Sequence, residues 1–267
     1  MKGIRTWFVS LVFIATLLAV GPWVGAAGLK PGDSVAVCGD SITEQRLYSL
    51  FIEEYLLMCQ PGADLEATQF GWSGEKAPGF LARMANDVLV FKPTVATTCY
   101  GMNDGGYAAS TPEVLRVYRE ATEGIVKAFQ EAGVRLIVVG SPGAVDTTTF
   151  RRGGAEVYNK TLSELRDIAR EVAAQHGAAF ADVHGAMIEA MPKAKARYGE
   201  AYHVAGPDGF HPRQNGHLIM AYAFLKALGC TGDIGTIQVD MKTGKATATP
   251  GHRVLKSAKG LVQIESK

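Results

Sequence analysis

Three short polar motifs contain residue types that can act together in nucleophilic chemistry. They are Gly39-Asp40-Ser41, Gly101-Met102-Asn103-Asp104 and Asp208-Gly209-Phe210-His211. A serine hydroxyl becomes a nucleophile when a base takes its proton, and histidine is the usual base near neutral pH. An aspartate can orient the histidine ring, and an asparagine amide can donate to an oxyanion that develops during the reaction. Ser41 and His211 are therefore the candidate nucleophile and base.

Each motif also has an ordinary structural explanation. Ser41 can cap a helix, residues 101–104 have the composition of a turn, and Asp208 can organise the chain before a helix. His217 lies inside the helical segment that follows, where a structural role is expected. The combination is more informative than any single motif, because each motif lies where a strand is expected to end or a helix to begin.

The segments around these motifs alternate between strand and helix patterns. Buried strands are predicted at residues 34–38, 64–70, 94–99, 134–139 and 178–183, and helices at 44–59, 78–90, 111–132, 155–175, 184–197 and 212–229. Each connection is long enough for a crossover, so the pattern predicts an α/β fold with a doubly wound, mainly parallel sheet between two layers of helices. Such sheets place their sites at the carboxyl ends of the strands, which is where the polar motifs fall.

The first 27 residues have the pattern of a secretory signal peptide. Lys2 and Arg5 precede an apolar run over residues 7–24, and small residues follow at 25–28. We expect cleavage near Ala26 or Ala27 and export to the periplasm or the medium. The alternative is an uncleaved membrane anchor, since the run is long enough to span a bilayer. The segment contains no cysteine, which excludes a lipid-modified N-terminal cysteine.

Composition bounds the remaining possibilities. The chain has 267 residues, 47% of them hydrophobic and 20% charged, so it can bury a sizeable core and is not a disordered tail. Its formal net charge is +1, and removal of the leader takes away two basic residues and no acidic one, which leaves 25 against 26. This balance excludes a basic field over the whole chain, and we expect no nucleic acid partner.

The four cysteines leave two interpretations open. Cys38 and Cys99 lie in strand-like runs, whereas Cys59 ends a helical run and Cys230 follows the last helix. Export to an oxidising compartment favours one disulfide, and buried free thiols are the alternative. Four cysteines allow three pairings, and nothing in the sequence chooses among them.

Residues 231–267 differ from the rest of the chain. They are rich in Gly, Thr and Lys and contain strand-like segments at 234–240, 245–249 and 260–265, with a turn at Thr243-Gly244. We interpret 28–230 as the main domain and 231–267 as a small β appendage. The chain ends soon after a strand-like segment, as a piece of a longer protein would.

Taken together, the motifs resemble those of the GDSL esterase/lipase family, also called SGNH hydrolases. The resemblance covers about residues 33–229 and implies the flavodoxin-like fold of that family. By this resemblance Ser41 matches the nucleophile, Asp208 and His211 match the acid and base of the triad, Gly74 of Trp72-Ser73-Gly74-Glu75 matches a backbone oxyanion donor, and Asn103 matches the side-chain donor.

The resemblance implies acyl transfer through a serine ester. His211 would take the proton of Ser41 and return it to the leaving alcohol, while Asp208 orients the ring. The N–H groups of Ser41 and Gly74 and the amide of Asn103 would surround the oxyanion. We expect no cofactor and no metal, because no cluster of His, Cys and carboxylates has metal-ligand spacing.

The substrate is expected to be a small-molecule or polysaccharide ester. Four aromatic residues lie beside the motifs, and they suit sugar rings or acyl chains, although at least two are expected to pack in the core: Trp72, Tyr100, Tyr107 and Phe210. Export favours an O-acetyl or other short acyl group on a carbohydrate. The alternatives are a lysophospholipase or lipase-type ester hydrolase and a non-catalytic carbohydrate-binding module. We expect no stable membrane insertion once the leader is removed, and no feature sets an oligomeric state.

Overall fold

Five parallel strands form the central sheet in the order β2-β1-β3-β4-β5. They are β1 (Ser34–Gly39), β2 (Glu66–Gly71), β3 (Val95–Cys99), β4 (Leu136–Gly140) and β5 (Ala179–Ala181). This computed structural model describes residues 28–59, 64–230, 232, 235–249, 251–258 and 260–266, so the predicted leader lies outside the described residues. The order of the strands reverses direction at β1, which places the ends of β2, β1 and β3 side by side.

Alternate residues of the strands face two separate hydrophobic clusters. Val35 and Val37 of β1 belong to one cluster, whereas Ala36 and Cys38 belong to the other. A period of two with both faces buried is what a strand in the middle of a parallel sheet requires. The short apolar runs in the sequence therefore correspond to strands covered on both sides.

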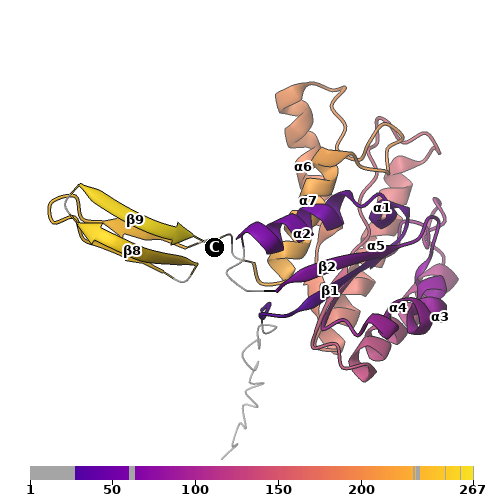
Figure 1. Ribbon diagram of the computed structural model, residues 1–267. Coiled ribbons are helices and arrows are strands. Elements are labelled where there is room, and N and C mark those ends of the chain that lie inside the picture. Colours follow the sequence, from indigo (N-terminus) through magenta and orange to yellow (C-terminus); the bar gives the residue numbers. More distant parts are fainter. Residues whose placement is uncertain are drawn as a thin grey trace, which may run out of the picture.

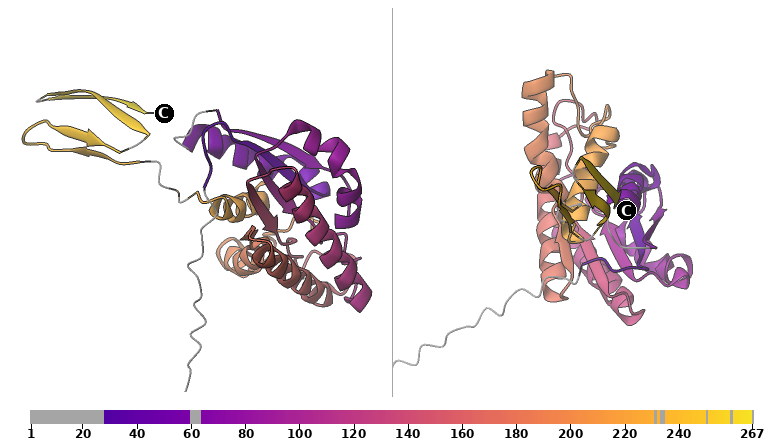
Figure 2. Two further views of the ribbon diagram at one scale, coloured as in Figure 1. Left: turned by 90° about the horizontal axis from the view of Figure 1, so that it is seen from below. Right: turned by 60° about the vertical axis from the view of Figure 1, so that its left-hand side comes forward.

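Helices cover both faces of this sheet, as predicted (Figures 1 and 2). They are α1 (Ser41–Glu44), α2 (Leu47–Cys59), α3 (Ala77–Asp87), the 3-10 helix η1 (Leu89–Phe91), α4 (Pro112–Glu131), α5 (Ala155–Gln175), α6 (Val183–Tyr198) and α7 (Gln214–Ala227). Buried side chains of α2, α6 and α7 enter the first cluster, those of α3 and α4 enter the second, and α5 contributes to both.

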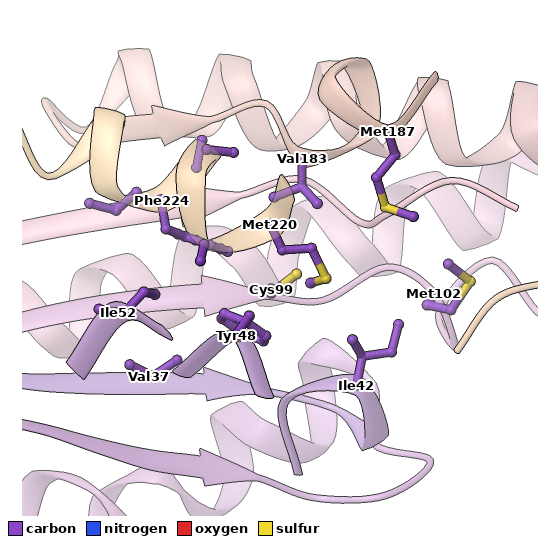
Figure 3. Packing of buried hydrophobic residues seen from close by; sticks show 14 of the residues in the cluster. Val37, Ile42, Tyr48, Ile52, Cys99, Met102, Val183, Met187, Met220 and Phe224 are labelled. Atoms are coloured by element: carbon purple, nitrogen blue, oxygen red, sulfur yellow. The ribbon is translucent and has the colours of Figure 1, made fainter. Parts of the chain in front are cut away.

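The last helix, α7, packs on β4 and β5 and lies beside α2. The ring of Tyr48 stacks on that of Phe224, with 5.6 Å between the centroids. Figure 3 shows these two side chains with Ile52 above Val37 of β1. Because α7 directly follows His211 in the chain, this packing holds the C-terminal motif close to the end of β1.

The prediction of one continuous helix over residues 44–59 is wrong. The structure has two helices there, and Arg46 between them takes a positive φ of 63°. Its predecessor Gln45 ends α1. The apolar residues that predicted this helix begin at Leu47, so they correspond to α2 alone and carried no information on residues 44–46. The last helix also begins two residues after Pro212, at Gln214.

The C-terminal residues form two antiparallel hairpins, which lie to one side of the α/β body in Figure 1 and in the left view of Figure 2. Strand β6 (Ile237–Val239) pairs with β7 (Ala246–Ala248), and β8 (His252–Ala258) pairs with β9 (Leu261–Ser266). The predicted turn at Thr243-Gly244 closes the first hairpin, where the Asp240 carboxylate accepts the N–H groups of Lys242 and Thr243. Strand β8 was not predicted, since none of its residues is buried and its sequence shows no clear alternation.

All four cysteines are free thiols. Cys38, Cys99 and Cys230 are buried, and Cys59 is half-buried at the end of α2. The structure therefore has the second of the two arrangements left open by the sequence, and no disulfide holds the fold.

Candidate active site

Ser41 lies at the carboxyl end of β1, as the first residue of α1. The Oδ1 atom of Asp40 accepts the N–H of Ile42 at 2.9 Å and so caps this short helix. The preceding residue must be glycine, because a Cβ on Gly39 would lie 2.0 Å from the Thr43 hydroxyl oxygen. The Gly-Asp-Ser motif thus makes a tight turn that leaves the serine half-buried at the sheet edge.

His211 and Asp208 complete a line of hydrogen bonds from Ser41. The Oγ of Ser41 is 2.9 Å from Nε2 of His211, and Nδ1 of His211 is 2.7 Å from Oδ2 of Asp208. The other carboxylate oxygen of Asp208 accepts the backbone N–H groups of His211 and Phe210. The imidazole is therefore fixed in orientation, with one nitrogen on the serine and the other on the carboxylate.

The environment of Asp208 favours its ionised form. Partial burial raises its pKa, but the hydrogen bonds from the backbone and side chain of His211 and from the N–H of Phe210 outweigh burial, so the pKa lies below its usual value. An anion at this position stabilises a positive charge on the neighbouring imidazole.

Asn103 lies beside this line, with its amide held at both ends. Its Nδ2 donates to Oδ2 of Asp40 at 3.3 Å and to the carbonyl oxygen of Glu75 at 3.1 Å, while the hydroxyl of Tyr107 donates to its Oδ1 at 2.8 Å. These bonds fix which end of the amide carries the donors. They also bring the amide next to the residues that adjoin Ser41 and Gly74.

Gly74 lies in the loop after β2. The N–H of Trp72 donates to the carbonyl oxygen of Gly39 at 3.0 Å, which joins this loop to the end of β1. Gly74 has a φ of +74°, a conformation that L side chains rarely adopt. The structure thus brings Ser41, Asn103, Asp208 and His211 together and places Gly74 in the adjoining loop.

Two buried carboxylates lie behind the site. Burial raises the pKa of Asp40 to about 7, with the nearby charges of Asp104 and Glu75 acting in the same direction. Burial also raises the pKa of Asp104 to about 6, although its carboxylate accepts the N–H groups of Ala77 and Gly101. Asp104 therefore ties the loop after β3 to the start of α3.

A partly buried ion pair supports the loop that contains Gly74, and sequence reasoning missed it. The guanidinium of Arg83 on α3 donates to both carboxylate oxygens of Glu75, at 2.6 and 2.7 Å, and to the carbonyl oxygen of Phe70. The Tyr100 hydroxyl lies 2.9 Å from Glu75 Oε2 and 3.2 Å from the Gly39 carbonyl oxygen. The sequence does not mark this pair, because Glu75 and Phe70 meet Arg83 only through the packing of α3 beside β2 and the loop after it.

The cavity at Ser41 is small and is formed by residues of polar type. It has a volume of about 380 Å³ and is lined by Ser41, Glu44, Gln45, Ser73 and His211. None of these lining residues has an apolar side chain. A larger groove of about 700 Å³ lies elsewhere, between α2 and α7.

The four aromatic residues near the motifs divide into two kinds. Tyr100 and Phe210 are buried, as expected for at least two of the four, whereas Trp72 is 60% exposed and Tyr107 is half-buried. His217 is fully buried, and its Nδ1 accepts the N–H of Tyr48. Burial lowers the pKa of His217 to about 4, so it stays neutral in a structural role, as predicted.

Two further properties concern the described part of the chain. Among residues 28–59 and 64–230 and the described stretches of the hairpins, no group of three or more His, Cys, Asp or Glu side chains could hold a metal ion. Within the same residues, no helix has the length and hydropathy needed to cross a membrane.

Comparison with known families decides where this arrangement belongs. The model of the GDSL-like lipase/acylhydrolase family matches residues 32–219, which include every motif described above. The chain belongs to this family. It is accordingly a serine hydrolase that acts on ester bonds, and the resemblance drawn from the four motifs is confirmed.

Individual relatives agree with this assignment. An acetylxylan esterase from Geobacillus stearothermophilus is 24% identical over 210 residues, which is 74% of this chain and 91% of that protein. A gut microbial diltiazem-metabolizing enzyme is 26% identical with a TM-score of 0.72, and the match covers 85% of this chain but only 54% of that one. A putative GDSL-like lipase from Parabacteroides merdae shares the fold, with 23% identity, a TM-score of 0.65 and coverage of 76% and 98%.

Structures of the Geobacillus esterase include two described as catalytic mutants. In one a serine is replaced by alanine, and in the other an aspartate is replaced by alanine. Both match this chain with 21–22% identity, and the likeness to them is one of fold.

Proposed function

We propose that this protein is an exported esterase that removes acetyl or other short acyl groups from carbohydrate hydroxyls through a Ser41-His211-Asp208 triad. The observation that carries the proposal is the unbroken line of hydrogen bonds from Ser41 Oγ through the His211 ring to Asp208. The replacement of a serine and of an aspartate in catalytic mutants of the acetylxylan esterase supports the same assignment.

In the proposed reaction His211 takes the proton of Ser41 as the hydroxyl attacks the ester carbonyl. The resulting oxyanion is stabilised by the N–H groups of Ser41 and Gly74 and by the amide of Asn103. His211 then gives the proton to the leaving sugar hydroxyl, and an acyl-enzyme remains on Ser41. Water, deprotonated by the same imidazole, attacks the acyl-enzyme; the bond between the acyl carbon and Ser41 Oγ breaks, the imidazolium returns the proton to Oγ, and the carboxylic acid is released.

The preference for a short acyl group rests on the walls of the cavity. A long acyl chain gains affinity by burying methylene groups against apolar side chains. The side chains that line the cavity are polar, and the apolar groove between α2 and α7 does not include Ser41 or His211. An acetyl group needs no such wall, which favours acetyl esters over lipid esters.

The preference for a carbohydrate rests on Trp72 and on the relatives. Trp72 is 60% exposed and lies two residues from Gly74. The guanidinium of Arg83 lies over its ring, 5.4 Å from the centroid, so the ring is supported from within the fold. An exposed, supported indole is a suitable platform for a sugar ring. Export follows from the leader pattern in residues 1–27.

The test is hydrolysis of p-nitrophenyl acetate, butyrate and octanoate by the protein without its leader, beside Ser41→Ala. We expect hydrolysis of acetate to exceed that of octanoate, and the Ser41→Ala variant to lose activity while keeping its circular dichroism spectrum. Ser163→Ala, on the half-exposed side of α5, is the matched control and should keep full activity. Wild-type activity in Ser41→Ala would refute the serine assignment, and a preference for octanoate would refute the short acyl group.

A second arm tests the alcohol part of the substrate. Acetate release is measured from acetylated xylan and fatty acid release from a lysophospholipid. The proposal requires release from the polysaccharide. Release from the lysophospholipid alone would replace the carbohydrate assignment with a phospholipase one.

A further inference from the structure

Arg152 lies at the edge of the active site, in the loop between β4 and α5. Its guanidinium carbon is 3.9 Å from the ring centroid of Tyr107 and 5.0 Å from that of Phe210. Tyr107 donates its hydroxyl hydrogen to the amide of Asn103, and Phe210 adjoins His211. The cation is therefore stacked on the two rings that contact the oxyanion donor and the base.

This guanidinium has no acidic partner. Arg152 is exposed, and in the part of the chain that the structure describes it makes neither a hydrogen bond nor an ion pair. By contrast, Arg83 is paired with Glu75, and Arg116 with Glu113 and Glu120. Stacking on aromatic rings fixes the plane of a guanidinium and leaves its N–H edge free for a planar anion.

The charges around Ser41 determine where an anionic group of the substrate can bind. Glu44 lines the cavity with Ser41 and His211, and Asp208 lies behind His211. An anionic group on the substrate is repelled from both carboxylates and is attracted toward Arg152.

We propose that Arg152 binds the carboxylate of an acidic sugar, so that the enzyme deacetylates uronic acid-containing polysaccharides in preference to neutral ones. The inference rests on the esterase function proposed above and names its substrate class. The carboxylate would lie over the Tyr107 side of the site while the ester carbonyl faces Ser41 and Asn103. Arg152 would act as a specificity-determining residue, with no part in bond making or breaking.

The experiment uses one polymer in two charge states. Partially O-acetylated polygalacturonate and the same preparation after methyl esterification of its carboxylates are compared, and acetate release gives kcat/KM for each. For the wild type we expect the acidic form to be preferred about fivefold, the size of one partly exposed charge pair. The preference should shrink as salt is raised, because the pair is screened.

Variants then locate the preference. Arg152→Met keeps apolar contact with Tyr107 but removes the charge, and its ratio of the two kcat/KM values should fall to about one. Arg151→Met removes an equal charge from the neighbouring exposed residue and should keep the wild-type ratio. Equal ratios in the two variants would show a diffuse field and overturn the assignment of Arg152.

The outcomes separate the two proposals. If the wild type hydrolyses the methyl-esterified polymer as fast as the acidic one, the inference on Arg152 fails while the esterase function stands. If the wild type releases acetate from neither polymer and cleaves no p-nitrophenyl acetate, the esterase function itself fails.

Discussion

The amide of Asn103 is held by Tyr107 on one end and by Asp40 and the Glu75 carbonyl on the other. These contacts fix the orientation of the amide before the substrate binds, and donation to an oxyanion then requires one of its two N–H groups to leave its present acceptor, the longer bond being the one to Asp40. We therefore predict that Asn103→Ala lowers kcat for p-nitrophenyl acetate about a hundredfold or more, with little change in KM. Steady-state kinetics on the folded variant give the answer, and a near-wild-type kcat would remove Asn103 from the mechanism.

A second prediction at this scale concerns the buried carboxyl of Asp40. Its pKa is about 7 in the folded protein and about 3.9 in an unfolded chain. Between these values the folded state holds a proton that the unfolded state has released, so the free energy of unfolding falls as pH rises from about 4 to about 7. The Asp40 contribution is about 1.4 kcal/mol per pH unit in this window.

The measurement is urea unfolding at several pH values for the wild type and for Asp40→Asn. Asp104 and His217 also titrate differently in the two states, and His217 acts in the opposite direction because its pKa is lowered to about 4. Both residues are retained in the variant, so subtraction gives the contribution of Asp40 together with its interaction with Asp104. The difference in unfolding free energy between the two proteins should change steadily with pH. A constant difference would contradict the raised pKa.

At the scale of elements, α3 supports the loop of Gly74 through Arg83. Removing this cation leaves the Glu75 carboxylate, whose side chain is 7% exposed, without a neutralising charge and with the Tyr100 hydroxyl as its remaining side-chain partner among the contacts described above. We predict that Arg83→Met destabilises the protein on the order of 3 kcal/mol and lowers kcat more than it raises KM. The control Arg116→Met breaks two exposed pairs and should cost about 1 kcal/mol or less.

The double variant Arg83→Met/Glu75→Gln distinguishes a lost ion pair from lost packing. It removes the unpaired charge, so most of the stability should return. Thermal unfolding of the four proteins measures this recovery. A double variant as unstable as Arg83→Met alone would show that Arg83 acts by its contacts with Trp72 and Phe80 instead of by its charge.

The sequence predicts interactions between residues that are close in the chain and misses those between residues that only the fold brings together. The helix at Thr111-Pro112 begins as predicted, with the Thr111 side chain accepting the N–H of Val114, because a cap depends on neighbours in the chain. The pairing of Glu75 with Arg83 depends on how β2 and α3 lie in space and has no counterpart in the sequence. The same holds for Arg152, whose aromatic partners lie 45 and 58 residues away in the chain.

At the scale of the whole molecule, the hairpins β6–β9 contrast with the α/β body. None of their strand residues is buried, whereas the body has two hydrophobic clusters of its own. Every residue of the candidate site lies before position 230. A domain with its own core folds alone. We predict that residues 28–230 have the same kcat/KM for p-nitrophenyl acetate as residues 28–267 and unfold in a single transition.

Truncation after residue 230 tests this division into a main domain and an appendage. The same stock of substrate is used for the truncated and full proteins, and both are checked by gel filtration. An aggregated truncated protein, or one that loses activity, would mean that the hairpins form part of the folding unit.

The free thiols of the described structure have a practical consequence for handling the enzyme. Burial raises the pKa of the Cys230 thiol to about 11 and raises those of Cys38 and Cys99 well above their usual value. These three sulfurs therefore stay protonated and react slowly. Cys59 alone of the four is half-buried. A maleimide dye should therefore attach at this one position in the native protein, and Cys59→Ser should abolish labelling. The enzyme can thus be tethered or made fluorescent through a natural residue, and it should tolerate reductants that inactivate disulfide-dependent hydrolases.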